Sequence, residues 1–108
     1  MPLQIIRQDI TRMKVDAIVN TTNEEMIGYS GVDYAVHRGA GAELDAECAR
    51  IAPLGLGTVK LTKGYNLPAS HVIHVTGPIV GRYLTKELEQ QLSDCYSNVL
   101  DMCADNGL

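Results

Sequence analysis

Apolar and polar positions follow two different periods along the chain, which predicts a mixture of strands and helices. Short strand-like segments are expected at residues 3–7, 16–20, 58–62 and 72–76. The continuous apolar run in D-A-I-V-N, residues 16–20, is typical of a strand covered on both faces. Strands that alternate with helices favour an α/β fold.

Helices are predicted where apolar residues recur every three or four positions. One begins after a polar loop at residues 21–31 and runs, as one helix or two, until Pro53. A last helix begins near Thr85, and Asn106-Gly107 is expected to end it in a left-handed cap, with Leu108 as the hydrophobic contact. A crossover helix normally returns the chain to its sheet, so we expect further strands beyond Leu108.

Composition limits the classes of function. The 108 residues, 45% hydrophobic and 20% charged, suit a single domain over residues 1–108. The net charge is −4 and the nine Lys and Arg are scattered, which argues against a nucleic-acid partner. Three cysteines cannot all pair, and neither a signal peptide nor a long apolar run is visible. We therefore expect no membrane partner and a cytoplasmic location.

Two asparagines mark the end of the second predicted strand. Asn20 closes the strand and Asn23 lies three residues later in the loop. Ligands of open α/β sheets bind outside the carboxyl ends of strands, where carboxamides can hydrogen-bond the hydroxyls of a sugar. Asparagine is also a common turn residue, so a purely structural role is the alternative.

The loop Gly28-Tyr29-Ser30-Gly31 leads into a predicted helix N-terminus. Glycine allows close approach of the backbone, and unpaired N–H groups with the helix dipole can hold an anion. It is not a Walker A loop, because no G-K-[ST] follows. Residues 30–33 also fit an S-x-x-[DE] capping box, in which Asp33 only closes the helix.

Three histidines offer further chemistry. Asp33 and His37 are four residues apart and share one helix face, as an acid/base pair, an exposed ion pair or a pair without a role. His71 and His74 have an odd separation on a strand, which points them to opposite faces. We interpret these two as structural and expect no metal site.

The order of the motifs is more specific than any one of them. The chain contains Q-D-I-T at residues 8–11, V-D-A-I-V-N-T-T-N at 15–23, G-Y-S-G-V-D-Y-A-V-H-R-G-A-G at 28–41, E-C at 47–48 and G-Y-N-L-P-A-S-H-V-I-H-V-T-G-P at 64–78. This order resembles the macrodomain family over nearly the whole chain. The resemblance implies a three-layer α/β/α fold with a mixed central sheet, here lacking its C-terminal strands and helices. It also implies a cleft for ADP-ribose, without a cofactor or a metal.

The resemblance assigns roles by position. Asp9 matches the acid that bonds the adenine amino group, beside Ile10. Five residues match the first diphosphate loop: Gly28, Tyr29, Ser30, Gly31 and Val32. Four match the catalytic set of the MacroD-like hydrolytic branch: Asn20, Asn23, Asp33 and His37.

Some positions depart from the family pattern. Gln8 replaces a glycine, Thr21-Thr22 replace two alanines, and Tyr29-Ser30 and Tyr34 stand where the family has glycine. The altered loop is expected to change loop shape and substrate choice. The family's second, Gly-rich phosphate loop follows the final helix and is expected beyond Leu108.

The implied reaction is hydrolysis at the anomeric carbon of an ADP-ribosyl group esterified to Asp or Glu, or deacetylation of O-acetyl-ADP-ribose. Asn20 and Asn23 would hold hydroxyls of the distal ribose, and Asp33 would orient or partly deprotonate a water molecule. The partner would be ADP-ribose or an ADP-ribosylated protein. The alternatives are a reader, which binds ADP-ribose without turning it over, and a fragment that is inactive by itself.

Overall fold

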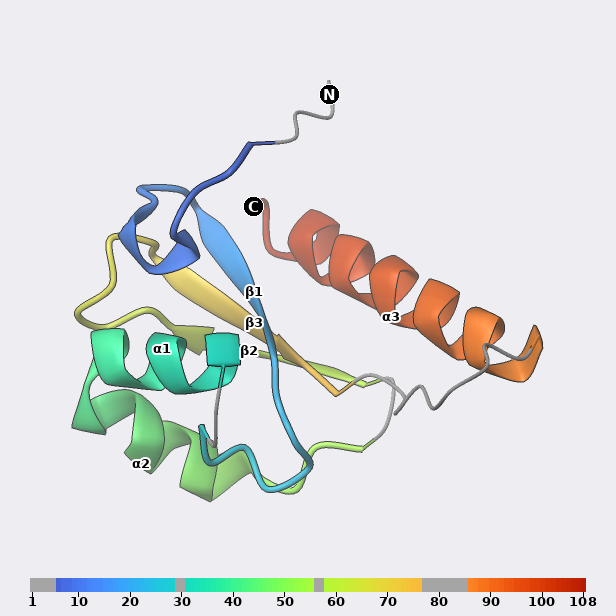
Figure 1. The fold of residues 1–108 in the computed structure, drawn as a ribbon, viewed down its shortest axis with the longest axis horizontal. Coiled ribbons are helices and arrows are strands. Elements are labelled where there is room, and N and C mark those ends of the chain that lie inside the picture. Colours follow the sequence, from blue (N-terminus) through green and yellow to red (C-terminus); the bar gives the residue numbers. More distant parts are fainter. Residues whose placement is uncertain (1–5, 29–30, 56–57, 77–85) are drawn as a thin grey trace.

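The protein is an alternating arrangement of helices and strands. The computed structural model describes residues 6–28, 31–55, 58–76 and 86–108. In chain order the elements are η1 (Ile10–Arg12), β1 (Ala17–Thr21), α1 (Gly31–Ala40), α2 (Ala42–Ile51), β2 (Val59–Lys63), β3 (His71–Val75) and α3 (Lys86–Asp105). Helices α1 and α2 cover one face of the sheet and α3 covers the other (Figure 1). The α/β class and the three-layer arrangement are confirmed.

The described sheet has three strands in the order β1-β3-β2. β1 runs parallel to β3, and β2 runs antiparallel to it, so the sheet is mixed as expected. The central strand β3 is buried on both faces, from Val72 to Val75, because helices lie on both sides. The register sets Asn20 of β1 directly beside His74 of β3.

Three of the four expected strands lie within one residue of their predicted bounds. The expectation of a strand at residues 3–7 is wrong for Ile6 and Arg7, and residues 3–5 lie outside the described ranges. A strand requires a ladder of backbone hydrogen bonds, and these two residues form none with the described chain. The side chain of Ile6 is 50% exposed.

The break between α1 and α2 occurs at Gly41, so the predicted segment is two helices. Gly41 has φ 97°, and its N–H donates to the carbonyl of His37 over 3.0 Å. At the other end of the chain, Leu108 N–H donates to Cys103 O over 2.9 Å and Gly107 has φ 68°. This is the expected left-handed cap. The expected N-caps, Ser30 and Thr85, lie outside the described residues.

The main core lies between the sheet and the α1–α2 layer. It consists of buried apolar residues from both layers and from the loops that connect them: Ile18, Met26, Val36, Ala40, Leu44, Cys48, Leu54, Leu67, Ala69 and Val72. Cys95 of α3 is buried and Cys103 is half-buried, and all three cysteines are free thiols. Among the described helices none is long and apolar enough to cross a membrane.

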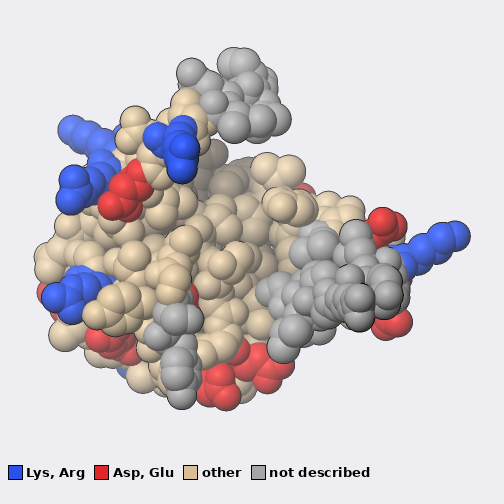
Figure 2. Space-filling model, in the orientation of Figure 1, with Lys and Arg blue, Asp and Glu red and all other residues tan. Residues whose placement is uncertain are grey.

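Charged side chains are dispersed on the face of the molecule seen in Figure 2. Lys and Arg lie near Asp and Glu toward the margins, and most of the centre is uncharged. Phosphate groups on this face would therefore depend on backbone N–H groups more than on a basic stripe.

Candidate active site

Asp33 lies in the first turn of α1 and faces the end of β1. Its Oδ1 accepts a hydrogen bond from Asn20 Nδ2 at 2.8 Å, and its Oδ2 accepts one from Thr22 Oγ1 at 2.8 Å. The residue is only 6% exposed, and a buried carboxylate requires such donors. Both oxygens are therefore held by residues at and just after the end of β1, whereas the capping-box interpretation assigned this carboxylate to closing the helix.

Asn20 lies behind this carboxylate, away from solvent. It is 0% exposed, and its Nδ2 is also 3.2 Å from Nδ1 of His74. Its Oδ1 has no hydrogen-bond partner among the described residues. Direct contact between this carboxamide and a ribose hydroxyl would need an accessible side chain. In this arrangement the side chain of Asn20 instead orients Asp33.

Asn23 begins the turn that carries the chain away from β1. Its backbone carbonyl accepts from Met26 N–H at 3.1 Å, and its Oδ1 accepts from Ile27 N–H at 3.3 Å. The side chain is half-buried, and within the described structure it forms no hydrogen bond with Asp33. The turn role that the sequence left open is thus present, and it leaves Asn23 partly accessible.

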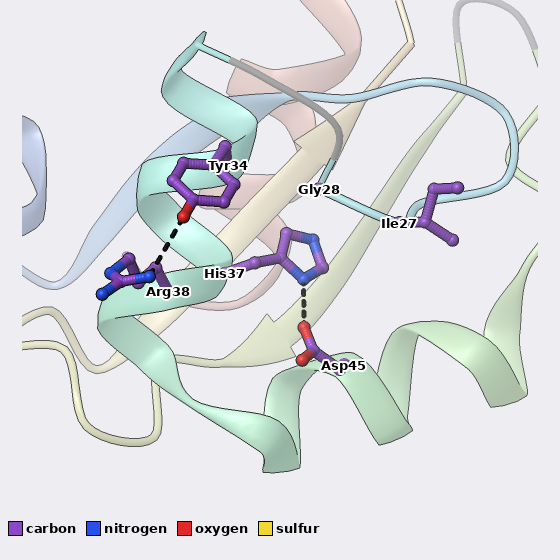
Figure 3. Close-up of a pocket in the computed structure, with 6 residues that line it drawn as sticks. All are labelled: Ile27, Gly28, Tyr34, His37, Arg38 and Asp45. Carbon is purple, nitrogen blue, oxygen red and sulfur yellow. Dashed lines mark hydrogen bonds and ion pairs between the residues drawn. The ribbon is translucent and has the colours of Figure 1, made fainter.

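His37 lies one helical turn after Asp33 and between two carboxylates, of which Figure 3 shows that of Asp45. Its Nδ1 is 2.7 Å from Oδ1 of Asp45 on α2, and its Nε2 is 3.4 Å from Oδ1 of Asp33. Because a carboxylate only accepts, Nδ1 carries the hydrogen of the shorter contact. Asp45 was missed by sequence reasoning, since it lies on a separate helix with no spacing rule to link it to His37.

An open pocket of about 280 Å³ lies beside this histidine. Six residues line it: Ile27, Gly28, Tyr34, His37, Arg38 and Asp45 (Figure 3). Gly28 has φ 64°, and a Cβ there would lie 2.7 Å from Cγ of His37. Gly28 therefore leaves room for the ring of His37. The close approach of this backbone to a ligand stays a prediction.

The first residues of α1 present backbone to solvent. Gly31 has φ 62° and Val32 is 49% exposed. The first N–H groups of a helix lack intrahelical partners, which suits them to bind a phosphate. Tyr29 and Ser30 lie outside the described residues.

Asp9 and Ile10 lie at η1, a short helix that the sequence did not predict. Asp9 is its N-cap, and Oδ1 accepts from Thr11 N–H at 3.0 Å and from Thr11 Oγ1 at 2.7 Å. These bonds hold the pKa of Asp9 below its usual value, with a smaller contribution from Arg12. The residue is exposed, whereas Ile10 packs against the core. Asp9 can thus reach a ligand while its carboxylate stays charged.

No group of three potential metal ligands is found among the described residues. His74, interpreted from sequence as structural, is 0% exposed and lies 2.9 Å from Thr62 Oγ1. Its ring centroid is 6.3 Å from that of His37. His74 is therefore buried next to His37 of the candidate site.

Known proteins share this architecture. Rat MACROD1, named ADP-ribose glycohydrolase, is 42% identical over 106 residues, which are 98% of this chain and 41% of that protein. MACROD2 of Xenopus laevis, also named ADP-ribose glycohydrolase, is 42% identical over 93% of this chain and 24% of its own length. The chain thus spans well under two thirds of these relatives.

Solved structures of macrodomains are similar to the structure of this chain. The Trypanosoma brucei macrodomain in complex with ADP-ribose has a TM-score of 0.85 and 41% identity, covering 94% of this chain and 41% of that one. The Oceanobacillus iheyensis macrodomain with ADP has a TM-score of 0.85 and 36% identity, covering 94% and 56%. The model of the Macro domain family matches residues 19–108. This chain therefore belongs to the macro domain family.

Proposed function

We propose that this chain binds ADP-ribose and hydrolyses ADP-ribosyl esters of Asp or Glu, or O-acetyl-ADP-ribose. The observation that carries the proposal is Asp33, a carboxylate held by two donors at the end of β1 and next to the N-terminus of α1. The relatives named ADP-ribose glycohydrolases and the ADP-ribose complex of the Trypanosoma brucei protein support it.

In the proposed reaction on an ADP-ribosyl ester of Asp or Glu, water attacks the anomeric carbon of the distal ribose. The bond from that carbon to the ester oxygen breaks, and the carboxylic acid leaves. Asp33 accepts a hydrogen bond from the attacking water through the lone pairs that Asn20 and Thr22 do not use. Its fixed orientation makes positioning of water its main contribution.

His37 lies beside Asp33 on the same face of α1. The bond from Nδ1 to Asp45 fixes the ring, so that Nε2 remains 3.4 Å from the Asp33 carboxylate. A ring held by a carboxylate on one nitrogen keeps a fixed orientation, as in other acid/base sites. Asn23 is the accessible carboxamide for a ribose hydroxyl, and Asp9 is the acid for the adenine amino group.

The phosphates are assigned to the loop from Gly28 to Val32. Gly28 and Gly31 both adopt positive φ, and the N–H groups of Gly31 and Val32 begin α1. A diphosphate near this helix end would gain hydrogen bonds and a favourable helix dipole.

The partner is then ADP-ribose or an ADP-ribosylated protein, with no cofactor, no membrane and no nucleic acid. A cytoplasmic location is supported by the free thiols.

The alternative function is that of a reader of ADP-ribose. One observation favours it: Asp33 is only 6% exposed and both its oxygens already accept hydrogen bonds. A carboxylate so engaged could shape a ribose pocket without activating water.

Two measurements separate these functions. Calorimetric titration with ADP-ribose tests binding, and a mono-ADP-ribosylated acidic peptide tests turnover. The proposal expects both saturable binding and release of ADP-ribose. Binding without release would establish the reader instead, and the absence of binding would reject both functions.

A further inference from the structure

A line of hydrogen bonds crosses the sheet and ends at Asp33. Thr62 Oγ1 of β2 lies 2.9 Å from Nε2 of His74 on β3. Nδ1 of His74 lies 3.2 Å from Nδ2 of Asn20 on β1, and this nitrogen lies 2.8 Å from Oδ1 of Asp33. The strand order β1-β3-β2 makes the line possible, because each strand contributes one member.

The chemistry of the groups fixes the direction of each bond. A carboxylate only accepts, so the atom of Asn20 that faces Asp33 is its amide nitrogen. The same nitrogen faces Nδ1 of His74, which must therefore accept. Nε2 then carries the hydrogen and donates it to Thr62 Oγ1, whose own hydrogen is directed to Lys63 O at 3.2 Å. The four bonds are mutually consistent only with His74 neutral and protonated at Nε2.

The three strand residues of this hydrogen-bonded line are buried. Asn20 and His74 are 0% exposed and Thr62 is 2% exposed, so water cannot replace a lost partner. Oδ1 of Asn20 has no hydrogen-bond partner among the described residues. The orientation of this carboxamide therefore depends on the two acceptors on its nitrogen side, which are Asp33 and His74.

The charged surroundings of His74 come from the α1–α2 layer. Burial is the main cause that lowers the pKa of His74, to about 4, and His37 lowers it further. Asp33 and Glu47 act in the opposite direction. The neutral ring that the hydrogen bonds require is thus the form present near neutral pH.

We propose that His74 is a positioning residue for the hydrolysis, acting through Asn20 to hold the Asp33 carboxylate toward the reacting water. This inference rests on the proposed function. Without the Nδ1 acceptor, the carboxamide of Asn20 can rotate and present Oδ1 to Asp33, which removes a donor and adds a repulsive contact. Binding of ADP-ribose depends on other residues. A change at His74 should therefore lower kcat and leave the affinity for ADP-ribose nearly unchanged.

Two nearly isosteric variants test the role. His74→Asn keeps an acceptor oxygen close to the position of Nδ1, whereas His74→Leu has none. We expect His74→Leu to lower kcat for the ADP-ribosyl ester on the order of tenfold, the effect of one hydrogen bond, with ADP-ribose affinity little changed. His74→Asn should retain most of the activity. A purely structural role predicts equal losses of Tm in both variants and kcat per folded molecule unchanged in both, which would overturn the proposal.

A second measurement does not depend on activity or on folding of a variant. The ¹⁵N shifts of the imidazole in the unaltered protein report which nitrogen carries the hydrogen. The expected result is a protonated Nε2 and an unprotonated Nδ1 at pH 7. The opposite tautomer would overturn the inference even in an active enzyme. If the protein proved inactive while the shifts matched, the proposed hydrolysis would fail and the hydrogen-bonded line would stand.

Discussion

Asn20 and Asp33 are thirteen residues apart in sequence, and a 2.8 Å hydrogen bond joins their buried side chains. The bond connects the end of β1 to the first turn of α1, and Thr22, the residue after β1, adds a second bond. The proposed water-positioning carboxylate is thus fixed by the sheet and not by its own helix. Loss of a donor from the strand should therefore affect turnover before it affects ligand affinity.

Replacing Asn20 tests this relationship. Asn20→Ala leaves Oδ1 of Asp33 and Nδ1 of His74 without their shared donor. We expect a loss of about 1–3 kcal/mol in the free energy of unfolding, the cost of buried unpaired polar groups, and a lower kcat. Asn23→Ala is the matched control for stability, because it removes a carboxamide without altering these bonds. Urea titrations of both variants provide the measurement, and equal stabilities would contradict the account.

The stability of the protein should depend on His74 in acid. Its pKa is about 4 in the folded state, below the ordinary value of 6.5. As the pH falls, the imidazole of His74 is therefore protonated in the unfolded chain before it is protonated in the folded chain. The contribution of His74 to the free energy of unfolding is complete above pH 6.5 and is lost as the pH falls toward 4. The slope is at most about 1.4 kcal/mol per pH unit from this group. His74→Asn should show a shallower slope over this window, and an identical slope would exclude His74 as its source.

Substitutions of Gly28 and Gly31 distinguish the cost of backbone strain from the cost of contact with the His37 ring. Gly28 and Gly31 both have positive φ, but only at Gly28 would an added Cβ meet the ring of His37. Gly31→Ala should cost about 1–2 kcal/mol, from the left-handed backbone alone. Gly28→Ala should cost more and should displace His37 from Asp45. Denaturation of the two variants compares them, and equal costs would indicate that the ring moves freely.

Asp9 should set the preference for adenine. Its carboxylate is exposed and charged, with Thr11 as its main hydrogen-bond donor. Asp9→Ala should weaken ADP-ribose binding by about 1.5–3 kcal/mol, the range for a hydrogen bond to a charged group. Arg12→Ala, which alters the neighbouring exposed residue, should leave the affinity nearly unchanged. Calorimetry on both variants would refute the assignment if Asp9→Ala bound like the unaltered protein.

Sequence periodicity predicted the elements better than their contacts. Alternation and apolar runs placed β1, β2 and β3 because those strands are buried in a fixed register. The spacing of Asp33 and His37 placed both on one face of α1. Spacing does not give the rotation of α1 against the sheet, so the burial of Asn20 behind Asp33 was not foreseen. His74 and Asp45 became visible as partners only when three strands and two helices were assembled.

The most direct test of the central claim is release of ADP-ribose under single-turnover conditions from a mono-ADP-ribosylated acidic peptide. The unaltered chain is compared with Asp33→Ala, and Asp101→Ala, an exposed carboxylate on α3, serves as the matched control. The account predicts that Asp33→Ala lowers the rate by about 100-fold or more while it still binds ADP-ribose, and that Asp101→Ala keeps the full rate. Release by Asp33→Ala at the rate of the unaltered chain would contradict it.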